Sequence, residues 1–210
     1  METSVAERVP INPGVVEWSG DNPGIYLKHA ADGPFTALSL FFKVVLSPHG
    51  RGTAMLILGD PENGRGWPDA PNLFITDNQA LGRYLIDNFV VNMPTFRGKS
   101  GLKAARFLPL TAARTTGDPR SRHVETVESG DLVAEMAWDA LGEPFAVEVN
   151  PEQSATGTHQ MYSIFIEAKA ASVTLDGTAL SGQVASRQLF GRTISTAFLA
   201  FSETWVRPGA

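Results

Sequence analysis

The last fifty residues constrain the fold most, because residues 159–206 form a pattern of three long strands joined by two turns. The first turn is Asp176-Gly177, a pair that tolerates the positive φ angles of a tight hairpin. The second is Gly191-Arg192. The third strand is apolar on both faces, with Ala197, Leu199, Phe201 and Trp205 on one and Ile194, Phe198, Ala200 and Val206 on the other. A strand buried on both sides belongs to a closed barrel, a sandwich or a sheet covered by helices.

The preceding residues add shorter strands and one helix. Apolar runs between glycine-rich and proline-rich turns predict strands near 15–18, 25–29, 35–47, 53–58, 72–76, 105–110, 123–128, 132–138 and 144–150. Thr76-Asp77-Asn78-Gln79 fits a capping box with Thr76 as N-cap, and large apolar residues then recur at helical spacing up to Val91. Residues 92–104 and 111–122 are expected to be loops. The connections are too short for helical crossovers, which favours antiparallel pairing.

A single helix of about four turns cannot cover both faces of a large sheet. We therefore expect an all-β domain at residues 15–210, built as a single antiparallel barrel with one short flanking helix. Residues 1–14 hold no periodic pattern and are expected to form a flexible arm. The architecture resembles that of lipocalins and other calycins, although the chain carries no lipocalin signature motif. A two-sheet β-sandwich is the alternative.

Composition bears on the possible partners and the cellular compartment. The net charge of −5 gives no basic surface for nucleic acid or an anionic membrane. No segment approaches the roughly 18 uninterrupted apolar residues of a membrane span. The absence of cysteine excludes disulfides, thiolate metal sites and a cysteine nucleophile, and it fits a reducing compartment. Since the N-terminus also lacks a signal-peptide pattern, we expect a cytoplasmic protein.

Sequence motifs for cofactor and metal chemistry are missing. The chain has no phosphate-binding loop, dinucleotide-binding fingerprint, nucleophile elbow or paired-histidine zinc motif. The four histidines are far apart and lack the spacing of metal ligands: His29, His49, His123 and His159. We therefore expect no cofactor and no metal.

Charged side chains on otherwise apolar strands are the candidates for catalysis. Glu203 lies between Phe201 and Trp205 in the last strand, and Glu167 lies in the first of the three long strands. A carboxyl group inside an apolar barrel has a raised pKa and can act as a general acid or base. His159 and Tyr162 open the long strand after a loop, where they could transfer protons at a barrel rim. Each of these four has a structural alternative as a solvated or paired side chain. Glu125, on another strand, is a further acid of this kind.

Aromatic residues and a lysine supply the ligand-binding candidates. They are Trp205, Phe201, Phe41, Lys43 and Trp138. Ordinary core packing is the alternative for the aromatic residues, and Lys43 can extend to a sheet edge. The bases Arg97, Lys99, Lys103 and Arg106 could receive an anionic ligand head group, or could form a solvated loop.

Two functional hypotheses follow, and they share one pocket. The first is binding of a small, mostly apolar molecule in a barrel cavity. The second is a cofactor-independent isomerase, cyclase or lyase that uses an interior carboxylate or histidine as general acid or base on an apolar substrate. An ionisable side chain that faces the pocket is the feature that distinguishes the enzyme hypothesis from the binding hypothesis. A third hypothesis is an assembly role through exposed sheet edges.

Overall fold

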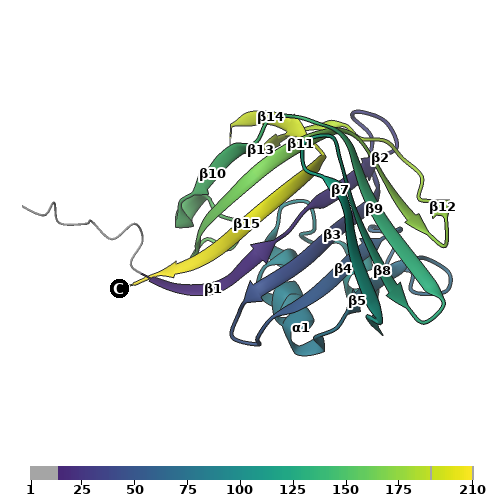
Figure 1. Cartoon of the computed structure of the whole chain (residues 1–210), viewed down its shortest axis with the longest axis horizontal. Coiled ribbons are helices and arrows are strands. Elements are labelled where there is room, and N and C mark those ends of the chain that lie inside the picture. The colour runs from purple at the N-terminus through teal and green to yellow at the C-terminus, as the bar shows by residue number, and fades with distance from the viewer. Residues whose placement is uncertain (1–13, 190, 210) are drawn as a thin grey trace, which may run out of the picture.

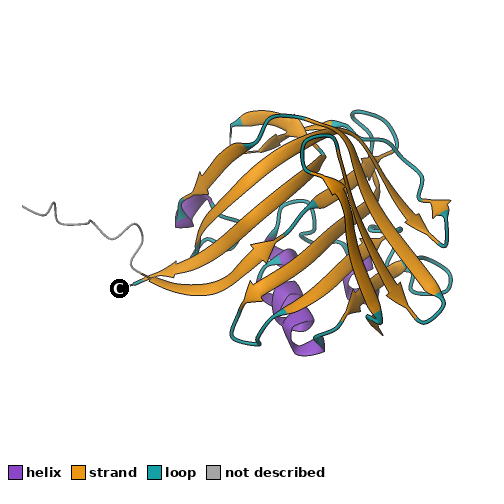
Figure 2. Cartoon of the chain, in the orientation of Figure 1, coloured by secondary structure: helices purple, strands orange, loops and turns teal. Residues whose placement is uncertain are grey.

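The structure is a computed structural model, and it describes residues 14–189 and 191–209. Over these residues the protein is mostly β, as Figures 1 and 2 show. The described strands are β1 (Gly14–Asp21), β2 (Gly24–Lys28), β3 (Phe35–Leu46), β4 (Gly52–Leu58), β5 (Asn72–Thr76), β6 (Arg106–Pro109), β7 (Ala112–Asp118), β8 (Arg122–Ser129), β9 (Leu132–Leu141), β10 (Phe145–Val149), β11 (Gln160–Leu175), β12 (Thr178–Ala179), β13 (Ser186–Leu189), β14 (Arg192–Ser195) and β15 (Ala197–Pro208). The expected arm at residues 1–14 lies outside the described residues except for Gly14, which opens β1.

Helical segments are few and short. The described residues contain the α-helices α1 (Gln79–Asn88) and α2 (Ser100–Ala104) and the 3₁₀ turns η1 (Val90–Asn92) and η2 (Pro151–Gln153). No helix in this part of the chain is long and apolar enough to cross a membrane. The all-β prediction is therefore confirmed, with α2 as an addition inside a segment that was expected to be a loop.

Most strands belong to one large sheet. Within the described residues it has thirteen strands in the order β6-β5-β4-β3-β1-β15-β11-β9-β8-β7, with β2, β10 and β12 attached to this path. The described pairings are antiparallel except that of β5 with β6, as the short connections predicted. β1 and β15 lie side by side, with Trp18 opposite Trp205. β13 and β14 form a separate two-stranded sheet.

The sheet curves so strongly that its two halves share one apolar cluster, which we call the inner cluster. It joins Phe41 and Met55 of β3 and β4 to Met136 and Trp138 of β9, although these strands are far apart in the sheet order. Trp138 Nε1 donates a hydrogen bond of 3.0 Å to the Gly24 carbonyl of β2, across the interior of the curve. The curvature therefore brings the halves of the sheet face to face.

The two end strands of the sheet are consecutive in the chain. Between β6 and β7, the Leu110 N–H donates to the Thr76 carbonyl at 2.9 Å. The Thr111 N–H donates to the Glu128 carbonyl at 2.8 Å. These bonds tie the β6–β7 connection to β5 on one side and to β8 on the other.

The opposite face of the sheet carries a second apolar cluster, the outer cluster, which α1 covers. Leu56 of β4 and Phe74 of β5 belong to it together with Leu81 and Leu85 of α1. Gly82 allows the helix to approach closely, because a Cβ atom there would lie 2.5 Å from Phe74 Cε1. The helix therefore flanks the sheet on its outer face.

The start of α1 differs from the capping-box prediction. Asn78 is the N-cap, and its Oδ1 accepts the Leu81 N–H at 3.1 Å. Thr76 remains in β5, where its Oγ1 accepts the Asn78 N–H at 3.0 Å. The prediction was wrong by two residues because Thr76 pairs with β4 and is still extended.

The middle of the last fifty residues also differs from the prediction. The Asp176-Gly177 turn is confirmed, with φ angles of 48° and 74°. The strand after it was expected to be long, but β12 has two residues and the chain leaves the sheet until β13. The loop residues 111–122 were likewise predicted wrongly, because they contain β7, whose side chains are all exposed and show no apolar alternation.

A β-bulge at Ser202 changes the face assignment of β15. Ser202 has a φ of 52°, and the register of β15 against β11 shifts at this point. Asp21 Oδ1 accepts the Ser202 N–H at 3.0 Å and holds the bulge. Phe201 consequently packs against the inner cluster, whereas Trp205 belongs to the outer cluster. The prediction that these two rings share a face is wrong.

Candidate functional site

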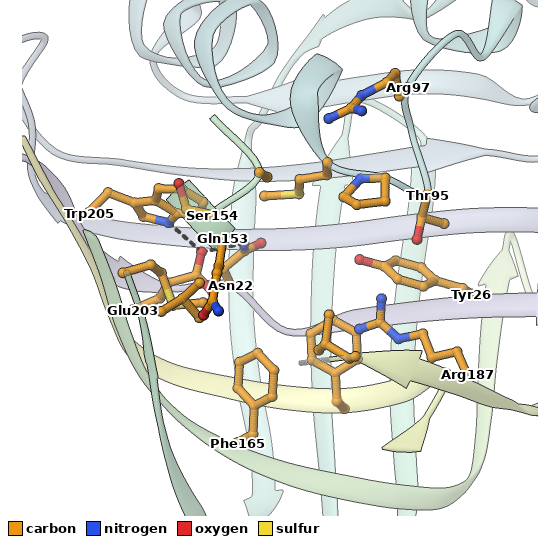
Figure 3. Close-up of a pocket in the computed structure, with 17 residues that line it drawn as sticks. Asn22, Tyr26, Thr95, Arg97, Gln153, Ser154, Phe165, Arg187, Glu203 and Trp205 are labelled. Atoms are coloured by element: carbon orange, nitrogen blue, oxygen red, sulfur yellow. Dashed lines mark hydrogen bonds between the residues drawn. The ribbon is translucent and has the colours of Figure 1, made fainter. Parts of the chain in front are cut away.

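A pocket of about 290 Å³ lies between the outer face of the sheet and the segments that cover it (Figure 3). β2, β10, β11 and β15 contribute residues from the sheet. The other walls come from Asn22 between β1 and β2, the loop after η1, η2 with the two residues that follow it, and β13. The apolar lining includes Met93, Val149, Met161, Phe165, Leu189, Phe198 and Trp205. The ionisable and amide side chains are Asn22, Tyr26, Arg97, Gln153, Arg187 and Glu203.

Glu203 is the acid of this pocket. Its side chain is buried, and its Oε1 accepts hydrogen bonds from Asn22 Nδ2 at 3.0 Å and from Trp205 Nε1 at 2.7 Å. Oε2 receives no hydrogen bond from the described residues, which leaves it available to a bound molecule. Burial raises the pKa of Glu203 to about 7, although the two hydrogen bonds act in the opposite direction. Near neutral pH this carboxyl can therefore either donate or accept a proton.

The bulge in β15 is what brings Glu203 to the pocket. Because Ser202 is the extra residue, Glu203 lies on the same face as Phe198, where simple alternation would have placed it with Phe201. Two consecutive residues at the end of β1 fix the arrangement: Asp21, the last residue of the strand, binds the bulge, and Asn22, the residue after it, binds the Glu203 carboxyl. The site is therefore built where both ends of the sequence meet.

Arg187 lies on another wall of the pocket, between two aromatic rings. The centre of its guanidinium group is 4.9 Å from the Tyr26 ring centroid and 4.8 Å from the Phe198 ring centroid. Its Nε is buried without a hydrogen-bond partner among the described residues. Burial lowers the pKa of Arg187 and raises that of the Tyr26 hydroxyl to about 12. The pocket thus holds a cation and an acid in an otherwise mainly apolar lining.

His159 lies outside the pocket lining, in a polar cluster behind Trp205. Its ring centroid is 6.3 Å from that of Trp205, and its Nε2 is 4.0 Å from Glu17 Oε1. Glu17 is already engaged, because it accepts a 2.6 Å hydrogen bond from the Tyr84 hydroxyl and pairs with Arg207 at 2.5 Å. Burial lowers the pKa of His159 despite the nearby Glu17 carboxylate, so the neutral imidazole is favoured.

The other two catalytic candidates are also outside this pocket. Glu167 Oε2 accepts the Ser195 N–H at 2.7 Å and so ties β11 to the end of β14. The Tyr162 hydroxyl is buried without a partner in the described chain, but Tyr162 does not line the pocket. Glu125 binds His123 Nε2 at 2.8 Å and accepts the Thr115 hydroxyl at 2.8 Å.

Of the five ligand-binding candidates, Trp205 lines the pocket. Phe41 and Trp138 belong to the inner cluster, Phe201 packs against it, and Lys43 is exposed on β3. Of the four basic candidates after η1, Arg97 lines the pocket, and its Nη2 donates to the Asn92 carbonyl at 2.8 Å. The described residues contain no group of three or more side chains placed to hold a metal ion.

Sequence reasoning missed Asn22, Tyr26 and Arg187. A signal for Arg187 existed, because it is a charged residue in a segment interpreted as strand, the same signal that identified Glu203. Its aromatic partners belong to β2 and β15, which no local pattern connects to it.

Comparisons with known proteins identify no relative of the chain. No protein-family model matches the chain. Searches of curated proteins and of solved structures give no significant match.

Proposed function

We propose that this pocket binds a small, mostly apolar molecule. The observation that supports the proposal is a mainly apolar pocket lined by the buried carboxyl of Glu203. Two hydrogen bonds to one oxygen of this carboxyl fix its position. Its volume of about 290 Å³ is close to the lower end of the range of roughly 300–1,000 Å³ for small-molecule sites. Such sites combine an apolar lining with a few polar groups that orient the ligand.

The proposal places the ligand on the outer face of the sheet. We propose that the curved sheet acts as a barrel, with its end strands joined through Leu110 and Thr111. The inner cluster occupies the interior of this curve. The ligand then binds between the sheet and its cover, where the loop after η1 and η2 could move to admit it.

A second candidate function is general acid–base catalysis on the same molecule, and the position of Glu203 favours it. A catalytic carboxyl is most effective when its pKa lies near the working pH, and that of Glu203 is about 7. Arg187 and the Tyr26 hydroxyl could stabilise negative charge that develops on a substrate oxygen. The reaction class is a cofactor-independent isomerisation, cyclisation or elimination driven by proton transfer.

Binding is tested by a thermal-shift screen of small apolar molecules with a pocket-filling variant. A ligand at one hundred times its dissociation constant stabilises the wild type by about 2.7 kcal/mol. Ala155→Trp fills the pocket and is expected to abolish that gain, since Ala155 lines it. Ala170→Trp, on the exposed side of β11, should retain it. Equal stabilisation of the Ala155→Trp variant would contradict the proposed site.

Catalysis is tested by Glu203→Gln on any molecule from that screen that the protein converts. Glutamine retains an oxygen to accept the Asn22 and Trp205 hydrogen bonds but cannot transfer the proton. We expect turnover to fall by about 10²-fold or more, the usual contribution of a positioned acid or base, with affinity changed only slightly. Unchanged turnover would remove Glu203 as the acid or base.

A further inference from the structure

Arg187 is a partly buried cation without an anionic partner among the described residues. In the described structure Arg65, Arg122 and Arg207 each pair with a carboxylate, with N–O distances of 2.5–2.6 Å. Arg187 forms no ion pair with a described residue, and its Nε is buried and unbonded. Removing a guanidinium group from water is costly unless hydrogen bonds and an opposite charge replace the lost hydration. The described residues therefore supply neither an acceptor for the Nε nor a counter-charge for the guanidinium group.

The surroundings of Arg187 hold its planar group in place but leave its Nε without a hydrogen-bond acceptor among the described residues. The Tyr26 and Phe198 rings attract the cation through their faces, which supply no hydrogen-bond acceptor for the N–H groups. Figure 3 shows the guanidinium beside Tyr26, directed toward the interior of the pocket, with Glu203 on the opposite side of the view. Glu203 forms no ion pair with Arg187, because its carboxylate oxygens lie more than 4.0 Å from the guanidinium nitrogens. The carboxyl of the pocket therefore does not neutralise Arg187.

We propose that Arg187 binds a carboxylate of the ligand, so that the pocket accepts a small apolar carboxylic acid. This inference rests on the proposed function and specifies its ligand class. A guanidinium group presents paired donors whose geometry matches the two oxygens of a carboxylate. The apolar body of the acid then lies against Met161 and Phe165 on the sheet side of the pocket.

Charge in the rest of the pocket is compatible with an anionic ligand. Arg97 adds a second cation to the lining. Glu203 is the acidic side chain of the lining, and it carries a proton in a substantial fraction of molecules near neutral pH. In that form its Oε2 can donate a hydrogen bond to the ligand without repelling it.

The test is a calorimetric titration near pH 6.5 with three molecules that share one chain: octanoate, 1-octanol and octylamine. The wild type is expected to bind octanoate at least about tenfold more tightly than 1-octanol, because hydrogen bonds to charged groups are stronger than neutral ones. Octylamine should bind more weakly than 1-octanol, since its ammonium group meets two cations.

Variants of Arg187 test whether this residue causes the preference for octanoate over 1-octanol. Arg187→Gln should bring the affinities for octanoate and 1-octanol within about threefold of each other, chiefly by weakening octanoate binding. Arg187→Lys retains the charge but loses the paired donors, so an intermediate preference is expected, and this variant serves if the glutamine variant does not fold. Arg192→Gln is the matched control, because Arg192 also stacks on an aromatic ring, Phe145 at 4.6 Å, but lies outside this pocket.

The outcomes separate this inference from the proposed function. Equal affinity of the wild type for octanoate and 1-octanol would overturn the carboxylate assignment and leave the apolar pocket standing. An octanoate preference that survives in both Arg187 variants would also overturn it. Failure of all three molecules to bind the wild type would count against the proposed function itself.

Discussion

Glu203 is a residue whose protonation the fold changes substantially. Its folded-state pKa of about 7 lies above the ordinary value of 4.5, because burial disfavours the charged form. Between these two pH values the folded protein holds a proton that the unfolded chain has released. The contribution of Glu203 to stability therefore falls as pH rises through this window, by about 3 kcal/mol when the titration is complete.

Glu203→Gln is expected to remove this pH dependence. Relative to the wild type, the variant should gain about 2–3 kcal/mol of unfolding free energy between pH 5 and pH 8, because its side chain stays neutral throughout. Urea unfolding of both proteins at the two pH values measures the difference. Glu143→Gln, at an exposed position, is the control and should show no comparable gain. A constant difference between the wild type and Glu203→Gln would contradict the buried carboxyl.

Single residues of the site could be predicted from the sequence only in part. Glu203 stands out because a carboxylate in an apolar strand is costly to bury and therefore demands an explanation. Tyr26 gives no such signal, since tyrosine in a strand is ordinary core material. Asn22 lies in a turn-rich segment, where asparagine is expected for local reasons.

At the scale of elements, the bulge in β15 decides which side chains face the pocket. Ser202 adopts a φ of 52°, a region that serine rarely occupies and that β-branched residues strongly avoid. The Asp21 carboxylate stabilises the bulge from 181 residues away. Local alternation cannot reveal such a contact, which is why the predicted faces of β15 are wrong beyond Phe201.

Substitutions of Ser202 test the bulge. Ser202→Val should lose about 2 kcal/mol, because valine is strained at positive φ. Ser202→Gly should stay within about 1 kcal/mol of the wild type, since glycine accepts this conformation. Chemical denaturation measures both, with Ser186→Val on the exposed side of β13 as the control for adding valine to a strand. A valine variant as stable as the wild type would show that the bulge does not form.

The contact of α1 with β5 is tested by whether one substitution, Gly82→Ala, raises or lowers the stability of the protein. Helix propensity alone predicts that Gly82→Ala stabilises α1 by about 1 kcal/mol. The Phe74 ring 2.5 Å from the added Cβ predicts the opposite, a net loss of about 1–3 kcal/mol. Thermal denaturation decides, with Gly66→Ala as control because its Cβ would meet only the Ala104 carbonyl at 3.6 Å. A stabilised Gly82→Ala variant would contradict the packing of the helix on the outer cluster.

Elements defined by adjacent residues were predicted better than those defined by distant contacts. The Asp176-Gly177 turn is confirmed because positive φ at both positions is a property of the two residues themselves. The helix cap was misplaced because Asn78 and Thr76 both suit a cap, and pairing of β5 with β4 determines which residue is still extended.

At the scale of the whole molecule, one curved sheet separates an inner from an outer apolar cluster. The alternation in β3 and the two-faced burial of β15 were visible in the sequence, so the all-β class could be predicted. The side of the sheet on which the pocket lies could not be predicted. That choice depends on how η2 and the loop after η1 cover the outer face, which involves contacts between segments far apart in the chain.

Local stability should follow position in the sheet. β7 lies at one end of the strand order, and its side chains are exposed, whereas β15 pairs along both edges and is largely buried. Amide hydrogen exchange is therefore expected to be much faster in residues 112–118 than in residues 197–201, because edge strands with few buried contacts open locally. Comparable protection of the two segments would contradict the strand order.

The most direct test of the ligand pocket is the titration of the Glu203 carboxyl, followed by carbon-13 NMR with and without 1-octanol. The signal is assigned by its absence in Glu203→Gln. We predict a midpoint near pH 7 in the free protein, moving to higher pH when 1-octanol fills the pocket and removes the remaining water around the carboxyl. A midpoint near 4.5, or one that bound 1-octanol leaves unchanged, would contradict an apolar ligand site beside Glu203.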